Sequence, residues 1–401
     1  MAAANPSDLM RGTDAQDAGP SSLSVDGNRL TLLADGPERL RALLTLIASA
    51  KESLRVLYYI WEDDESGRRV RDALVNAQRR GVAVSLLVDG FGAANAPDGF
   101  FAELIEAGCR FCRFSPRFGR RYLLRNHQKL AMADERRVII GGFNIADDYF
   151  GTVERGAWRD LGLEVEGDSV AMLARYFDAL LAWTQAPVSR IRDLRRVLQR
   201  HSVTDGPLHW LFGGPTRRLS PWAQAVRRDM REARRLDVIA AYFAPGPRLL
   251  RRSGNVARRG GAARLVTAAR SDNTATIGAA RHTYWVLLKR GVRVFEYQPT
   301  KLHSKLFVMD DVVHIGSANF DMRSLFINLE MMLRIKDKAF ADAMRRFVDG
   351  EVAQSVEITL EGHREQRTLF NRVRWGLAYF LVAIADYGIT RRLNFGGKAQ
   401  S

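Results

Sequence analysis

The sequence has little cysteine and no long apolar run. Two cysteines among 401 residues exclude a disulfide framework and favour a reducing compartment. The longest uncharged apolar run, Trp375–Ala385, has 11 residues, whereas a membrane-spanning helix needs about 20. The N-terminal segment lacks a basic start followed by an apolar stretch, so we expect no signal peptide.

Lysine is also scarce, although the chain is strongly basic. Lys plus Arg total 61 against 45 Asp plus Glu, which gives a net charge of +16, yet only 8 of the basic residues are lysines. The excess points to a polyanionic partner, and both nucleic acid and an anionic membrane surface fit it. A hydrophobic content of 46% excludes a disordered chain.

The chain contains two copies of one motif. The pattern H-x-K-x-x-x-x-D occupies residues 127–134 and again residues 303–310, and the two histidines are 176 positions apart. A glycine and then an asparagine, Asn144 or Asn319, follow each copy. The composition predicts about 0.01 chance occurrences of this pattern. Two copies therefore indicate an internal repeat.

Strand-like runs alternate with helical patterns around both motifs. Helical spacing of apolar residues occurs at 69–80 and 276–290, and the strand-like runs cover 80–89, 108–114, 262–267 and 291–297. This alternation predicts an α/β fold with a largely buried sheet, and a boundary between the halves near residue 203.

These motifs resemble the phospholipase D superfamily, and within it the bacterial cardiolipin synthases. The resemblance spans roughly residues 25–350 and is carried by residues 295–305, 316–324 and 328–330, with further similarity at 242–245 and 271–272. In lacking an N-terminal pair of transmembrane segments, the sequence is similar to the shorter, peripheral type.

The resemblance implies two homologous phospholipase D-like halves. Each would be a mixed sheet flanked by helices, and the halves would pack with pseudo-twofold symmetry around one shared active site. We expect a mobile arm at 1–24, halves at 25–186 and 204–360, a basic linker at 187–203, and a basic, apolar segment at 361–401.

The resemblance also assigns roles to individual residues. His127 would attack phosphorus and form a phosphohistidine, while His303 would act as general acid and base. The remaining members of the expected catalytic and phosphate-binding set are Lys129, Lys305, Asn144, Asn319 and Ser317. Sequence symmetry by itself gives neither histidine a preference as nucleophile.

Acidic residues complete the expected site. A nucleophilic imidazole needs a partner that fixes its tautomer. Glu330 follows His303 by 27 residues and matches the family's orienting acid, and Asp160 is the candidate partner of His127. The motif aspartates, Asp134 and Asp310, count with the catalytic motifs, but we expect them to cap turns.

One position departs from the repeat, because Gly142 stands where the second half has Ser317. One hydroxyl is therefore missing from the first half, although a small residue still permits the turn. We expect no metal and no cofactor, because lysine and asparagine already offset the phosphate charge.

The C-terminal apolar run suggests where the protein works. Arginines precede it at 364, 367, 372 and 374, and basic residues follow it at 391, 392 and 398. This pattern favours a helix in the membrane interface. The alternative is a terminal helix packed on the core or on a second subunit. We expect peripheral attachment to the cytoplasmic face of the cell membrane and no nucleic-acid partner.

The function implied by the resemblance is transfer of a phosphatidyl group. Two phosphatidylglycerol molecules would give cardiolipin and glycerol through a phosphohistidine. The same chemistry directed to water or another alcohol would give phospholipase D activity, and a metal-independent nuclease is a further alternative that the positive charge would serve.

Overall fold

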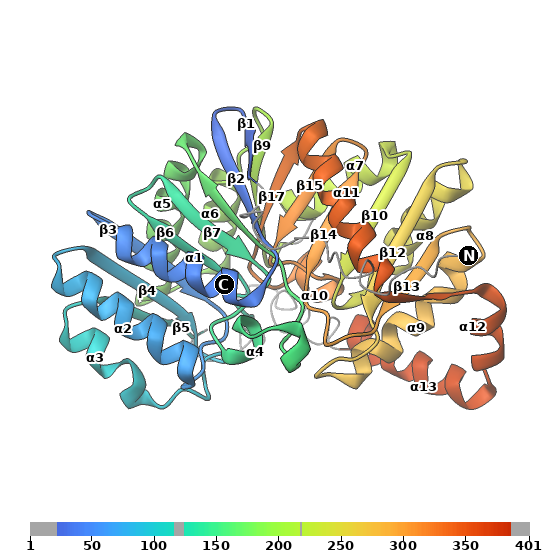
Figure 1. Ribbon diagram of the computed structural model, residues 1–401, viewed down its shortest axis with the longest axis horizontal. Coiled ribbons are helices and arrows are strands. Elements are labelled where there is room, and N and C mark those ends of the chain that lie inside the picture. Colours follow the sequence, from blue (N-terminus) through green and yellow to red (C-terminus); the bar gives the residue numbers. More distant parts are fainter. Residues whose placement is uncertain (1–21, 116–123, 217–218, 386–401) are drawn as a thin grey trace, which may run out of the picture.

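The computed structural model describes residues 22–115, 124–216 and 219–385. Two halves lie side by side, the first coloured blue to green and the second yellow to red (Figure 1). Each half contains one eight-stranded sheet with helices packed against it. The predicted α/β fold of two similar halves is confirmed.

Both sheets mix parallel and antiparallel strands. The first, in spatial order, contains β1 (Ser22–Val25), β2 (Asn28–Leu33), β8 (Gly162–Glu166), β7 (Arg137–Gly141), β6 (Leu130–Ala133), β3 (Ser53–Tyr58), β4 (Ala83–Asp89) and β5 (Arg110–Phe114). The second contains β18 (Ser355–Ile358), β13 (Arg293–Tyr297), β12 (Ala262–Ala268), β10 (Arg235–Ala240), β14 (Lys305–Met309), β15 (Val312–Gly316), β17 (Glu330–Lys336) and β9 (Leu208–Gly213). A separate parallel pair joins β11 (Phe243–Ala244) to β16 (Phe320–Asp321).

The two sheets have the same topology. In the first, β3, β4 and β5 run parallel, and β6, β7, β8 and β2 continue from β3 as antiparallel neighbours. In the second, β10, β12 and β13 run parallel, and β14, β15, β17 and β9 continue in the same way. The internal repeat predicted from the motifs therefore extends to seven strands of each sheet, with β1 and β18 as additions at the edges.

Helices connect the strands. They are α1 (Gly36–Ser49), α2 (Glu65–Arg79), α3 (Ala102–Glu106), α4 (Asp147–Phe150), α5 (Ala171–Gln185), α6 (Ile191–Arg200), α7 (Pro221–Glu232), α8 (Pro247–Arg258), α9 (Thr274–Leu288), α10 (Met322–Phe326) and α11 (Lys338–Ala353). Short 3₁₀ turns occur at η2 (Asp98–Phe101), η3 (Val153–Arg155) and η4 (Asp168–Val170). The two helices predicted by periodicity are α2 and α9. Each begins a few residues earlier than expected, because Asp64 and Asn273 accept backbone N–H groups as N-caps.

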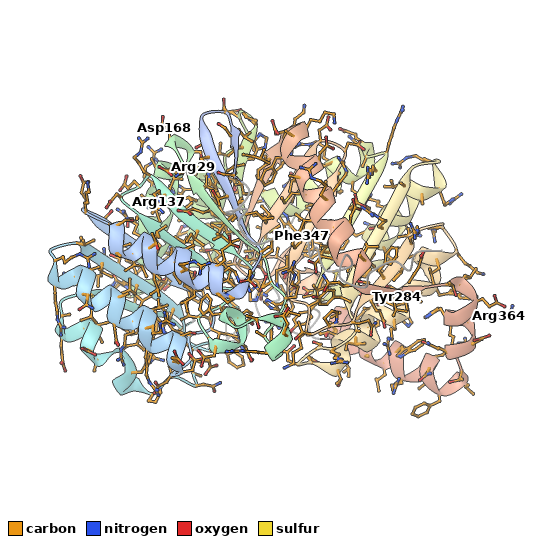
Figure 2. All side chains as sticks on the ribbon, viewed as in Figure 1. Arg29, Arg137, Asp168, Tyr284, Phe347 and Arg364 are labelled. Atoms are coloured by element: carbon orange, nitrogen blue, oxygen red, sulfur yellow. The ribbon has the colours of Figure 1, made fainter. Side chains whose placement is uncertain are left out.

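One apolar cluster runs through both halves. It joins side chains of β6, β7, β8 and α5 to side chains of β14, β15, β17 and α11. Arg159 from the first half bonds Glu351 of α11 at 2.6 Å and lies over the Phe347 ring. Figure 2 shows Phe347 near the middle of the molecule, between the two halves. The halves therefore share one core, which fixes the segments that meet between them.

Two expected boundary segments differ from the prediction. Ser22–Val25 form β1 and pair with β2, so residues 22–24 are not part of an arm; residues 1–21 lie outside the described residues. The stretch expected as a linker contains α6, whose Leu194 and Leu198 are buried in the shared core. The stretch is packed structure and not a linker, because apolar side chains on one face of this arginine-rich helix are buried in the core.

The C-terminal segment is helical. It forms α12 (Leu360–Gln366), α13 (Leu369–Tyr379) and a π-helical turn, η5 (Phe380–Ala385), while residues 386–401 lie outside the described part. Trp375, Tyr379 and Ala383 are buried, and α13 packs on α9, where Gly278 permits close approach. One face of α13 is therefore packed on the core, as the alternative to a membrane-interface helix predicts. Among residues 22–385 outside the two short gaps, no helix is both long and apolar enough to span a bilayer.

Candidate active site

The two motifs meet between the halves because each leads into a central strand. Lys129 directly precedes β6, and Lys305 begins β14. The His127 N–H donates to the Leu329 carbonyl at 2.9 Å, and the His303 N–H donates to the Arg159 carbonyl at 2.7 Å. Each motif therefore pairs through its backbone with a segment of the opposite half.

This backbone pairing places each histidine beside an acid of the other half. His127 Nδ1 lies 3.1 Å from Glu330 Oε2, and His303 Nδ1 lies 2.5 Å from Asp160 Oδ2. The acids were predicted correctly as partners of histidines, but the assignment of Asp160 to His127 and Glu330 to His303 was wrong. Leu329 precedes Glu330 and Arg159 precedes Asp160, so the crossed backbone pairs also cross the side-chain pairs.

Both imidazoles are held in an environment that favours the neutral form. Burial and the charge of Lys305 lower the pKa of His303 to about 4, despite the opposing effect of Asp160. Burial and Lys129 also lower the pKa of His127. Burial alone would raise the pKa of Asp160, but His303 and Lys305 hold it below its ordinary value. A carboxylate on Nδ1–H fixes the tautomer that leaves a lone pair on Nε2.

The two motif lysines are buried close to the histidines. Lys129 Nζ donates to the His127 carbonyl at 2.7 Å, and Lys305 Nζ donates to the His303 carbonyl. Burial is the main cause that lowers the pKa of Lys129 to about 7 and that of Lys305 to about 8. A bound anion would favour the charged form of both side chains.

A cavity of about 400 Å³ contains both histidines. Its polar and aromatic lining comes from both halves: Tyr59, Phe91, Arg125, Asn144, Tyr149, Trp158, Tyr242, Asp272, Asn319, Asp321, Arg323, Ser324 and Asn328. The rings of Tyr149 and Trp158 lie 5.3 and 5.4 Å from the His303 ring, and the Tyr59 ring lies 4.9 Å from that of His127. The shared site that the sequence predicts is thus a single cavity.

The expected phosphate-binding residues separate into two kinds. Asn144 and Asn319 line the cavity, and Asn144 is fixed by the Ile60 N–H and the Tyr149 hydroxyl. Ser317 instead donates to Glu330 Oε2 at 2.5 Å and accepts the Met331 N–H at 3.0 Å. Ser317 therefore contacts Glu330, the acid that lies against His127.

Gly142, the equivalent of Ser317, leaves space for the acid of its own half. A Cβ at this position would lie 2.5 Å from Asp160 Oδ1 and 3.1 Å from Lys305 Cδ. The missing hydroxyl is therefore not simply a lost ligand, because the Asp160 carboxylate lies where a side chain would stand.

The motif aspartates lie at the far ends of the motif strands, outside the cavity lining. Asp134 accepts the N–H groups of Lys51, Glu52 and Ser53, and Asp310 accepts those of Arg234 and Arg235. Both adopt positive φ angles of 51° and 49° in tight turns. They hold the turns that start β3 and β10, as expected.

Sequence reasoning missed most of the aromatic and positioning residues. Trp158 lies two positions before Asp160, and Tyr59 stands in an aromatic run, but neither carries a motif. Asp89, at the end of β4, accepts N–H groups of Phe91 and Asn126 and so fixes the segment before His127. Its place at the end of a predicted strand was the available signal.

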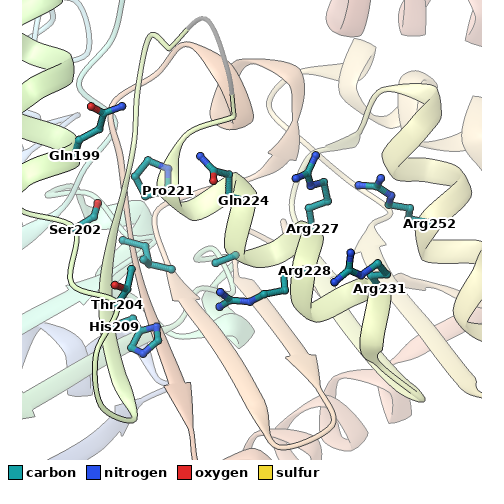
Figure 3. A pocket seen from close by; sticks show the side chains of 12 residues that line it. Gln199, Ser202, Thr204, His209, Pro221, Gln224, Arg227, Arg228, Arg231 and Arg252 are labelled. Carbon is teal, nitrogen blue, oxygen red and sulfur yellow. The ribbon is translucent and has the colours of Figure 1, made fainter.

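A larger cavity lies elsewhere in the second half. It measures about 710 Å³, and Figure 3 shows Arg227, Arg228 and Arg231 of α7 with Arg252 of α8 around it. It contains neither motif histidine. Cavity size alone would therefore indicate the wrong site. In the part of the chain that the structure describes, no group of three or more His, Cys, Asp or Glu residues is arranged to hold a metal ion.

Comparison with known proteins agrees with this geometry. A family profile described as "Cardiolipin synthase, PLD-like domain" matches residues 43–181 and 226–350, one segment in each half. Cardiolipin synthase B of Salmonella typhimurium is 32% identical over 371 residues, covering 88% of this chain and 87% of that protein. The chain belongs to the cardiolipin synthase family of phospholipase D-like proteins.

Other members and structures extend the comparison. Cardiolipin synthase B of Escherichia coli K12 is 30% identical over 361 residues, with 88% of this chain and 87% of that protein covered. The major cardiolipin synthase ClsA of Bacillus subtilis is 28% identical over 380 residues, 90% and 76% of the two chains. The crystal structure of phosphatidylserine synthase from Haemophilus influenzae shares the fold, with a TM-score of 0.68, 15% identity and coverage of 93% and 96%. The chain is accordingly a phosphatidyltransferase of the phospholipase D superfamily.

Proposed function

We propose that this family member makes cardiolipin from two phosphatidylglycerol molecules through a phosphohistidine. The observation that carries the proposal is one cavity with two imidazoles, each bonded through Nδ1 to a buried carboxylate and each next to a buried lysine. The family membership selects the phosphatidyl group as the group transferred.

In the first half-reaction, His127 Nε2 attacks the phosphorus of the donor lipid. The N–P bond forms as the P–O bond to glycerol breaks, and His303 gives its proton to the departing glycerol oxygen. Lys129 and Lys305 neutralise the non-bridging oxygens, and Asn144 and Asn319 donate hydrogen bonds to them. The phosphate charge also offsets the lysine charges that lower the imidazole pKa values, so His303 can bind its proton.

In the second half-reaction, a hydroxyl of a second phosphatidylglycerol attacks the same phosphorus. His303 takes the hydroxyl proton, the new P–O bond forms, and the N–P bond to His127 breaks. Cardiolipin leaves, and both histidines return to their starting states. Asp160 and Glu330 keep the two imidazoles in the required tautomer throughout.

A lipid substrate also requires contact with a bilayer, and we include peripheral attachment at the cytoplasmic face of the membrane in the proposal. The net charge of +16 supports attraction to anionic lipid. The same charge would serve a nuclease, which makes DNA the appropriate second substrate to test.

The test uses purified full-length protein with phosphatidylglycerol vesicles and, separately, with single-stranded DNA, both without added metal. We expect cardiolipin and glycerol in equal amounts and intact DNA. Phosphatidic acid without cardiolipin would show that the enzyme hydrolyses the lipid and does not transfer the phosphatidyl group, which contradicts the proposal. DNA cleavage with unchanged lipid would also overturn it. In the original protein, quenched with denaturant at neutral to alkaline pH because the N–P bond is acid-labile, the phosphatidyl adduct should lie on His127; an adduct on His303 instead would reverse the two roles.

A further inference from the structure

One face of α13 and η5 exposes an unusual number of apolar side chains. Twelve large apolar residues are exposed in the described chain, and seven of them lie between residues 369 and 384: Leu369, Phe370, Val373, Leu377, Phe380, Leu381 and Ile384. Leu369 and Phe370 are 75% and 73% exposed. We call these seven side chains the apolar face. Such clustering marks a contact surface, because single exposed apolar residues are normally scattered.

The apolar face is separate from the face that packs on the protein. At about 100° per residue, the four members in α13 fall within an arc of about 100°. The buried Trp375 and Tyr379 lie on the other side of the helix and pack on α9, with the Tyr379 ring 4.9 Å from that of His282. The packing against α9 therefore holds the helix in place and leaves its apolar face outward.

Positive charge borders the apolar face. Arg364, Arg372 and Arg374 are exposed, Arg367 is half-buried, and residues 366–385 contain no acidic side chain. Arg374 lies over the Phe370 ring at 5.8 Å. Figure 2 shows Arg364 projecting from the outer rim of the second half. An apolar stripe with basic borders matches the boundary between acyl chains and anionic headgroups.

The same helix touches the wall of the catalytic cavity. The Tyr379 hydroxyl donates to the Pro245 carbonyl at 2.8 Å, and Ala383 and Tyr379 pack with Ala244 and Met322. Met322 lies between two cavity-lining residues, Asp321 and Arg323. The apolar face is therefore attached directly to elements that form the catalytic cavity.

We propose that the apolar face docks on an anionic lipid bilayer and holds the catalytic cavity at the lipid surface. The identification of a lipid bilayer as the partner rests on the proposed function. The exposure of the apolar face is an observation that does not depend on that function. A second copy of the chain is the competing occupant. The bordering arginines disfavour it, because two such faces would bring like charges together.

The test compares two double variants of the full-length protein. Leu369→Ser with Val373→Ser removes part of the apolar face, and Ile105→Ser with Val188→Ser removes two exposed apolar side chains outside that face as a matched control. With vesicles of equal phosphatidylglycerol and phosphatidylcholine, the first variant should bind about 100-fold more weakly, at about tenfold for each lost side chain. The control should bind as the original protein does, and both variants should keep its melting temperature.

A second readout separates docking from chemistry. On short-chain phosphatidylglycerol dispersed as monomers, the Leu369/Val373 variant should turn over at the original rate, because its cavity is unchanged. Unaltered vesicle binding by this variant would overturn the docking proposal, as would a dimer of the original protein that dissociates on substitution. Vesicle binding that depends on the apolar face, without turnover of either lipid form, would support docking and defeat the proposed function.

Discussion

The two halves repeat one backbone, yet they fix their histidines with different side chains. In the first half, Gly142 leaves room for the short Asp160. In the second, Ser317 fills that position and bonds the longer Glu330. The pair in the first half, Gly142 and Asp160, is therefore smaller than the pair in the second half, Ser317 and Glu330. Repetition has thus preserved the task of holding Nδ1, while the residues that perform it have changed.

The surroundings of the two histidines differ as well. His303 is bonded at 2.5 Å to Asp160 and has the rings of Tyr149, Trp158 and Tyr242 around it. The His127 side chain is 12% exposed against 6% for His303, and its partner lies at 3.1 Å. Equivalent motifs therefore present two unequal imidazoles, as the proposed nucleophile and the proposed acid–base group require.

Among the substitutions that test this comparison, removing either histidine should reduce kcat the most. We expect His127→Ala and His303→Ala each to reduce kcat by at least about 10³-fold, because both half-reactions need both groups. His201→Ala, outside the cavity, is the matched control and should retain its rate. A variant of either motif histidine with near-normal turnover would contradict a site shared by the two halves.

Neutralising either acid should cause the next largest loss of kcat. Asp160→Asn and Glu330→Gln should lower kcat between about 10²- and 10⁴-fold, since an amide can select the wrong imidazole tautomer. We expect the larger loss for Asp160. Its contact with His303 is 2.5 Å long, shorter than the 3.1 Å contact between Glu330 and His127, and Glu330 is additionally held by Ser317. Steady-state kinetics on phosphatidylglycerol vesicles measures both, and equal losses would remove this difference between the halves.

Substitutions at Gly142 and Ser317 test the same difference between the halves, with smaller expected losses of kcat. Gly142→Ser should lower kcat about tenfold or more by displacing the Asp160 carboxylate, although it restores the hydroxyl expected from the repeat. Ser317→Ala should cost up to about tenfold, since one hydrogen bond to a charged group is lost. If Gly142→Ser increased the rate, the position would be a phosphate ligand after all.

The lysines predict a dependence of the rate on pH, and this effect should be the weakest near neutral pH. A lysine is charged below its pKa, so Lys129 and then Lys305 lose their charge as the pH rises through about 7 and about 8. We expect kcat/KM to fall above pH 7, by up to about tenfold for each pH unit once a lysine titrates. Lys129→Arg should move the fall toward pH 8, at a lower overall rate. A flat profile from pH 6 to 10 would contradict this role.

The sequence predicts the repeat and the fold class well, because these depend on local spacing. Helical periodicity and a rare motif suffice for α2, α9 and the two histidine–lysine pairs. The pairing of Asp160 and Glu330 was not predictable, because pairing within or between halves satisfies the repeat equally well. Only the crossed backbone contacts at Leu329 and Arg159 distinguish the two arrangements.

Other residues depended on packing between distant segments. Periodicity does not show that Leu194 and Leu198 of α6 reach the shared core, since arginines dominate that stretch. The aromatic rings around His303 come from α4, from the segment before β8 and from the segment between β10 and β11. Their proximity is a property of the assembled halves and leaves no pattern in any one window of sequence.

The central claim is that each half's acid orients the histidine of the other half. Nitrogen NMR of histidine-labelled protein tests it directly, with Asp160→Asn compared with the original chain. We predict that the Nδ1–H signal of His303 changes and its tautomer becomes mixed, while the signals of His127 stay in place. A change at His127 with His303 unaffected would contradict the crossed arrangement.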